Sequence, residues 1–67
     1  MKTPAIGRTL QRLRERKGLS QLALSKRVEV PQSYISELEA GSKTNPGLAT
    51  LRKLAKGLGV PVTELLG

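Results

Sequence analysis

Hydrophobic residues recur three or four positions apart along most of the chain, with polar residues between them. This spacing places the apolar side chains of each stretch on one face of an α-helix. No stretch alternates between apolar and polar residues as a half-buried β-strand does. The apolar positions are Ile6, Leu10 and Leu13, then Leu24 and Val28, then Ile35 and Leu38, and finally Leu48, Leu51, Leu54, Ala55 and Leu58. The pattern therefore predicts an all-α fold.

Residues that start or stop helices set the expected boundaries of the first three elements. Gly18 is placed to end a first helix over residues 5–17. The Ser20 hydroxyl can accept a hydrogen bond from the free amides of a second helix over residues 21–28. A third helix follows after a short turn and reaches about Gly41.

Two further helices are expected in the last third of the chain. A segment rich in turn-forming residues precedes an amphipathic helix over residues 48–58. Pro61 suits the first position of a short helix that continues over residues 62–66. Val60, Leu65 or both then close the core. The sequence thus predicts five helices.

The second and third predicted helices together have the pattern of a helix-turn-helix. The third helix carries Ile35 and Leu38 on one face and polar side chains on the other. Those polar residues are Gln32, Ser33, Ser36 and Glu37. Base edges in the DNA major groove differ in their hydrogen-bond donors and acceptors, so these four residues are the predicted readers of base sequence.

The charge distribution favours a polyanionic partner. Lys and Arg number 12 against 5 acidic residues, for a formal net charge of +7. Residues 1–27 hold most of the basic residues, whereas residues 28–42 hold only the acidic Glu29, Glu37 and Glu39. A strongly basic small domain collects on polyanions, and charge alone favours nucleic acid and an anionic membrane surface equally.

Length and composition restrict the classes of function. A chain of 67 residues fits a single domain, residues 1–67. Without Cys or His it lacks the commonest general base, the thiol nucleophile and the usual zinc ligands, and its carboxylates show no metal-binding spacing. We expect a non-enzyme with no metal and no cofactor. Short apolar runs and an N-terminus without a signal core favour a cytoplasmic protein that does not span a membrane.

A set of residues spread over most of the chain matches a known family. They are Gly18-Leu19-Ser20-Gln21, Leu24, Val30, Ile35, Glu39, Gly41, Asn45-Pro46, Leu54-Ala55, Leu58-Gly59-Val60 and Leu65-Leu66. From about Ile6 to Leu66 the chain resembles the Cro and repressor family of lambdoid phages, also called the XRE family of helix-turn-helix regulators. The resemblance implies a sequence-specific regulator of transcription that represses by binding double-stranded DNA. Since one domain contacts few phosphates, we expect a homodimer on a pseudo-palindromic operator.

The resemblance also implies roles for residues around the third helix. Ser20 and Gln21 would bind a phosphate at the start of the second helix, where free amides and the helix dipole favour an anion. The segment after the third helix would bind phosphates through Ser42, Lys43, Thr44 and Asn45. Arg14 and Glu39 would form a structural ion pair. For Tyr34, packing against the core and a phosphate contact through its hydroxyl both remain open.

The chain departs from the family pattern at three places. Glu29 stands where the family commonly has Gly, at a cost on the order of 1 kcal/mol if the backbone there is left-handed. Pro31 replaces a hydroxyl cap, so we expect it at the first position of the third helix. The segment after that helix offers one basic residue, Lys43, where the family often has several, which suggests modest affinity per monomer.

Other side chains have two interpretations. Glu37 either accepts a hydrogen bond from cytosine or is solvated or ion-paired. Arg8, Arg12 and Arg16 form a basic strip that attracts DNA at long range or contacts phosphate directly. The apolar residues near the C-terminus belong to a dimer interface or to the core. They are Val62, Leu65 and Leu66.

Two functions compete with gene regulation. The first is an antitoxin-type module that binds a protein partner, with DNA binding secondary or lost. The second is a basic protein that binds membranes or RNA through its first helix. The turn and the polar third helix favour duplex DNA over both.

Overall fold

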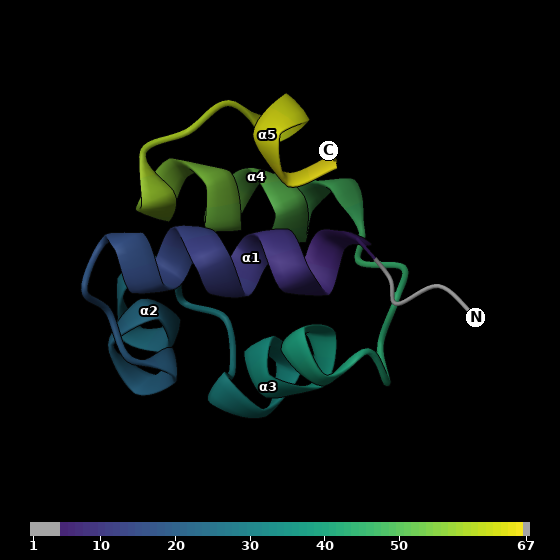
Figure 1. Ribbon diagram of the computed structural model, residues 1–67, viewed down its shortest axis with the longest axis horizontal. Helices are drawn as coiled ribbons and strands as arrows, with labels where there is room; N and C mark the ends of the chain where they lie inside the picture. The colour runs from purple at the N-terminus through teal and green to yellow at the C-terminus, as the bar shows by residue number, and fades with distance from the viewer. Residues whose placement is uncertain (1–4, 67) are drawn as a thin grey trace.

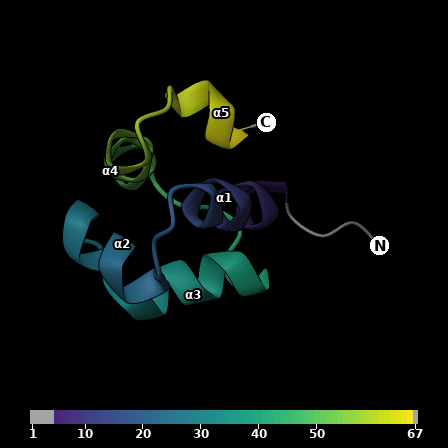
Figure 2. The ribbon, with the colours of Figure 1, turned by 60° about the vertical axis from the view of Figure 1, so that its left-hand side comes forward.

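The computed structural model describes residues 5–66, which form five α-helices joined by short segments (Figure 1). They are α1 (Ala5–Arg16), α2 (Gln21–Val28), α3 (Gln32–Ala40), α4 (Leu48–Leu58) and α5 (Val62–Leu66). Helix α1 runs through the middle, with α2 and α3 on one side and α4 and α5 on the other, as Figure 2 also shows. The all-α, five-helix prediction is confirmed. Residues 1–4 and 67 of the predicted domain lie outside the described residues.

Every helix contributes at least one fully buried side chain to a common core. The side chains of Leu10, Leu24, Ile35, Leu38, Leu54, Leu58 and Leu65 are 0% exposed. Burying one such side chain stabilises the fold by roughly 1.5–3 kcal/mol. Helices this short are marginal in isolation, so their stability comes from this shared packing.

The helix ends refine three predicted boundaries. Helix α1 ends at Arg16, one residue earlier than expected, because the chain turns at Gly18 with φ 71°. Pro31 is the N-cap of α3 and not its first residue: its ψ of 141° is extended, while its carbonyl accepts from the amides of Tyr34 and Ile35. Pro61 likewise precedes α5, which begins at Val62.

Glycines allow two close helix contacts. A Cβ at Gly7 of α1 would overlap the carbonyl oxygen of Leu38 in α3, and a Cβ at Gly57 of α4 would overlap Cγ1 of Val28 in α2. Gly57 is therefore part of helix packing as well as a weak helix former. These contacts fix α3 against α1 and α2 against α4.

Candidate nucleic-acid interface

The polar face of α3 points to solvent because the opposite face is anchored in the core. Ile35 and Leu38 are 0% exposed. Gln32, Ser33 and Glu37 are exposed, and Ser36 is half-buried. The four predicted base readers thus lie on one helix, and three of them are exposed.

A buried ion pair holds α3 against α1. Arg14 donates from Nε to Glu39 Oε2 at 2.7 Å and from Nη2 to Oε1 at 2.9 Å. Its third contact is a hydrogen bond from Nη1 to the carbonyl of Leu19 at 2.8 Å. The bonds to Glu39 raise the pKa of the Arg14 guanidinium, outweighing the lowering by burial. This is the pair that the family resemblance implied.

Gln21 joins the same network, a contact that sequence reasoning missed. Its Nε2 donates to Glu39 Oε1 at 3.0 Å, so one carboxylate receives hydrogen bonds from both α1 and α2. No local spacing could indicate a contact between residues 18 positions apart. The first residue of α2 is thereby fixed relative to α3, which gives the two helices a defined mutual orientation.

Ser20 caps α2 as predicted. Its Oγ accepts a hydrogen bond from the Ala23 amide at 3.0 Å, and its backbone is extended. Because the hydroxyl accepts in this bond, its hydrogen is available to donate to another group.

The segment after α3 bends back toward that helix. Lys43 Nζ lies 3.8 Å from Glu37 Oε1 and 5.0 Å from the centre of the Tyr34 ring. Ser42 Oγ donates to the Glu37 carbonyl at 3.3 Å, while Thr44 and Asn45 are exposed. Tyr34 is half-buried and packs against the core. Lys43, Tyr34 and the predicted reader Glu37 thus form one cluster at the surface of α3.

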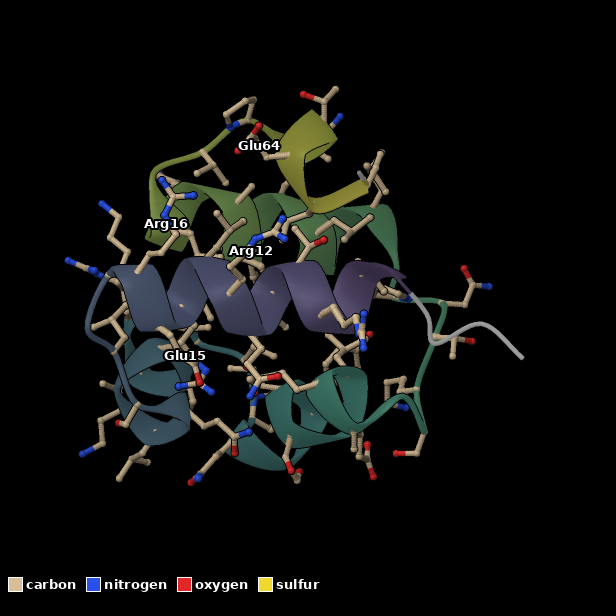
Figure 3. The ribbon with its side chains drawn as sticks, in the orientation of Figure 1. Arg12, Glu15, Arg16 and Glu64 are labelled. Atoms are coloured by element: carbon tan, nitrogen blue, oxygen red, sulfur yellow. The ribbon has the colours of Figure 1, made fainter. Side chains whose placement is uncertain are left out.

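Two residues of the basic strip of α1, Arg12 and Arg16, point away from α3. In Figure 3, Arg12 and Arg16 point from α1 to the side of α4 and α5, the side on which Glu64 also lies, whereas Glu15 points to the side of α2 and α3. That this strip attracts DNA at long range stays a prediction. Arg12 and Arg16 are not placed to contact the same phosphates as α3.

The C-terminal apolar residues divide between core and surface. Leu65 is 0% exposed and belongs to the core, so of its two interpretations, core residue or dimer contact, the structure supports the core. Val62 and Val60 are partly buried against the core, and Leu66 is 61% exposed. Of the three candidates, Leu66 is the one whose side chain is mainly on the surface.

Comparisons with known proteins place this architecture among regulators. The sequence model of the Helix-turn-helix family matches residues 10–65. The HTH-type transcriptional regulator SlrR of Bacillus subtilis is 42% identical over 60 residues, which are 90% of this chain and 40% of SlrR. The uncharacterized HTH-type transcriptional regulator y4dJ of Sinorhizobium fredii is 43% identical over 61 residues, 91% of this chain and 78% of y4dJ.

A solved structure extends the likeness to three dimensions. The structure of SinR, described as the master regulator for biofilm formation, in complex with DNA superimposes with a TM-score of 0.90 at 35% identity. The match covers 92% of this chain and 98% of that one.

Within residues 5–66, no helix combines the length and hydrophobicity needed to cross a membrane.

Proposed function

Because the chain belongs to the XRE type of the helix-turn-helix family, whose members are transcriptional regulators, we propose that it represses transcription by binding a specific DNA sequence as a homodimer. The observation that carries the proposal is the α3 helix. Its apolar face is locked into the core, and its polar face stands free beside the capped start of α2.

In this proposal α3 lies in the major groove. Gln32 can hydrogen-bond to both N6 and N7 of an adenine, and Ser33 and Ser36 can donate to or accept from several base edges. Glu37 can accept only, which selects the amino group of cytosine and rejects bases that present acceptors. A good bidentate contact discriminates between bases by about 1–3 kcal/mol.

Phosphates would be bound on both sides of α3. On one side the Ser20 hydroxyl and the free amides at the start of α2 offer donors. On the other side lies Lys43, with Thr44, Asn45 and the hydroxyl of Tyr34 as further donors. The Ser42 hydroxyl would join them on turning away from the Glu37 carbonyl, to which it donates in the free protein. In the free protein Lys43 offsets the charge of Glu37. Its movement from Glu37 to a phosphate would leave the carboxylate facing the bases.

The similarity to SinR supports this placement. The relative whose structure was solved with DNA shares the fold of this chain over almost its whole length. A single helix-turn-helix contacts few phosphates, so we propose two copies on half-sites about 34–36 Å apart, one helical turn of DNA.

Selection of bound duplexes from a random pool, at near-physiological salt, tests the proposal. We expect enrichment of an inverted repeat, and Gln32→Ala and Glu37→Ala are expected to relax selection at different base positions. Lys43→Ala is the matched variant for a phosphate contact. It is expected to weaken binding to all sequences about equally and to reduce the slope of log affinity against log salt concentration by about 1. Binding that is sensitive to salt but enriches no sequence would contradict the proposal and favour a protein partner such as a toxin.

A further inference from the structure

A basic pocket lies away from the proposed DNA-binding residues. It is an open depression of about 520 Å³ where α1, α2 and α4 end. Its lining residues are Lys17, Arg27, Val28, Glu29, Lys53, Lys56, Gly57 and Gly59. In Figure 1 the ends of α1 and α4 lie on the left, and the segment between α3 and α4 lies on the right. None of the lining residues belongs to α3 or to residues 41–47.

The charges around the pocket are strongly unbalanced. Four cationic side chains face one carboxylate, that of Glu29. Among residues 5–66, the ion pairs within 4.0 Å are Arg14–Glu39 and Lys43–Glu37, and neither involves the pocket. Its ammonium and guanidinium groups are therefore open to an added anion.

Helix dipoles explain only part of this charge. Arg27 and Lys56 lie in the last turns of α2 and α4, where a cation offsets about half a negative charge at the helix end. Lys53 lies before the last turn of α4. Lys17 follows α1, and its Nζ lies so close to Gly59 that a Cβ at Gly59 would be 3.3 Å from it. The dipole at the end of α4 therefore does not account for Lys53.

Two of the lining residues are glycines. Gly57 packs on Val28, and Gly59 has no side chain to cover the ammonium group of Lys17. A volume of about 520 Å³ lies within the range of small-molecule sites, about 300–1,000 Å³. Phosphoryl groups bind both Lys, as a point charge, and Arg, through its planar fork.

We propose that this pocket binds a small polyphosphate compound, one that carries several adjacent phosphoryl groups. Four lining residues would bind its charges: Lys17, Arg27, Lys53 and Lys56. Glu29 is the carboxylate that opposes such a ligand. The site would give the regulator a ligand that reaches it without competing for α3.

Titration of the full chain with inorganic tripolyphosphate, followed by amide NMR shifts at 150 mM salt, tests the proposal. We expect saturable shifts centred on Val28, Glu29, Gly57 and Gly59. The double variant Lys17→Gln/Lys53→Gln is expected to weaken binding at least tenfold. The control Arg8→Gln/Arg12→Gln removes two charges from exposed positions outside the pocket, and we expect a change below twofold. Adenosine triphosphate, in a parallel titration, distinguishes a nucleotide from an inorganic source of the same chemistry.

Glu29→Gly gives an independent readout. Gly keeps the left-handed backbone, and removal of the carboxylate is expected to tighten tripolyphosphate binding several-fold. Equal weakening by the two double variants would overturn the proposal, because total charge would then explain binding. Shifts without saturation, shifts centred on α3, or pocket shifts caused only by a short DNA duplex would also overturn it.

Discussion

At the scale of single residues, Glu39 links three helices through its carboxylate. Its side chain is 5% exposed and receives two hydrogen bonds from Arg14 and one from Gln21. Burial separates the Arg14 guanidinium from water, so the Glu39 carboxylate takes the place of water as the acceptor for Nε and Nη2. The pKa of Arg14 is raised above an already high ordinary value, so its charge and its stabilising contribution persist up to strongly alkaline pH.

We expect Glu39→Ala to unfold the protein instead of changing its DNA specificity. Removing one partner of a buried ion pair costs roughly 3–5 kcal/mol, a large share of the stability of a small domain. Urea denaturation followed by circular dichroism measures the loss. Glu37→Ala is the matched control: its carboxylate is 53% exposed, and a change below about 0.5 kcal/mol is expected. Similar losses in both variants would contradict this assignment.

Glu29 is the other residue with a distinct energetic role. It ends α2 with φ 59° and ψ 41°, the left-handed conformation in which a side chain is strained. We expect Glu29→Gly to stabilise the fold by about 1 kcal/mol, which raises the thermal midpoint by about 4–8 °C in a domain of this size. Glu29→Ala loses the same carboxylate but keeps the strain, so it should show no such gain. A clearly lower thermal midpoint for Glu29→Gly would contradict the assignment of backbone strain to Glu29.

At the scale of helices, the position of α3 depends on its contact with α1. Gly7 brings the two backbones together beside Leu38, and Arg14 joins them at Glu39. The polar face of α3 is presented only while both contacts hold.

We therefore expect Gly7→Ala to destabilise the fold by about 1–3 kcal/mol, because its Cβ overlaps the Leu38 carbonyl and forces the helices apart. Thermal unfolding measures the effect. Gln11→Ala places an alanine at an exposed position of the same helix, and we expect a change below about 0.5 kcal/mol. An unchanged midpoint for Gly7→Ala would mean that α1 and α3 have room to separate.

At the scale of the whole molecule, the proposed homodimer requires a surface beyond the core. Leu66, one of the candidate dimer contacts, is 61% exposed at the end of α5. Leu48, which is not a candidate, is 56% exposed at the start of α4. Because Leu65 is part of the core, Leu66 is the better site for testing association without unfolding the chain.

Light scattering after size exclusion, with and without DNA, tests the dimer. We expect Leu66→Ser to weaken dimerisation at least tenfold, since burying a leucine side chain contributes about 1.5–3 kcal/mol and each 1.4 kcal/mol is tenfold. Leu48→Ser is the matched control, with comparable exposure and no expected effect on mass. A monomer on and off DNA would remove the dimer from the proposed function.

Local spacing predicted the elements well. The five helices lie where apolar residues recur, and the Ser20 cap was found from its residue type alone. The error at Pro31 arose because a proline suits both a cap and a first helical turn, and only its extended ψ of 141° distinguishes them. The DNA-reading roles of Gln32, Ser33, Ser36 and Glu37 stay predictions.

The sequence by itself determined which residues form helices, which face of each helix is apolar and where α2 is capped, because these properties depend on neighbours within about four positions. The tertiary structure alone decided that Gln21 binds Glu39, that Arg12 and Arg16 point away from α3, and that Leu65 is core. It also decided that Lys17, Arg27 and Lys53 line one pocket. Those relations join residues far apart in the chain, and packing of the helices around α1 brings them together.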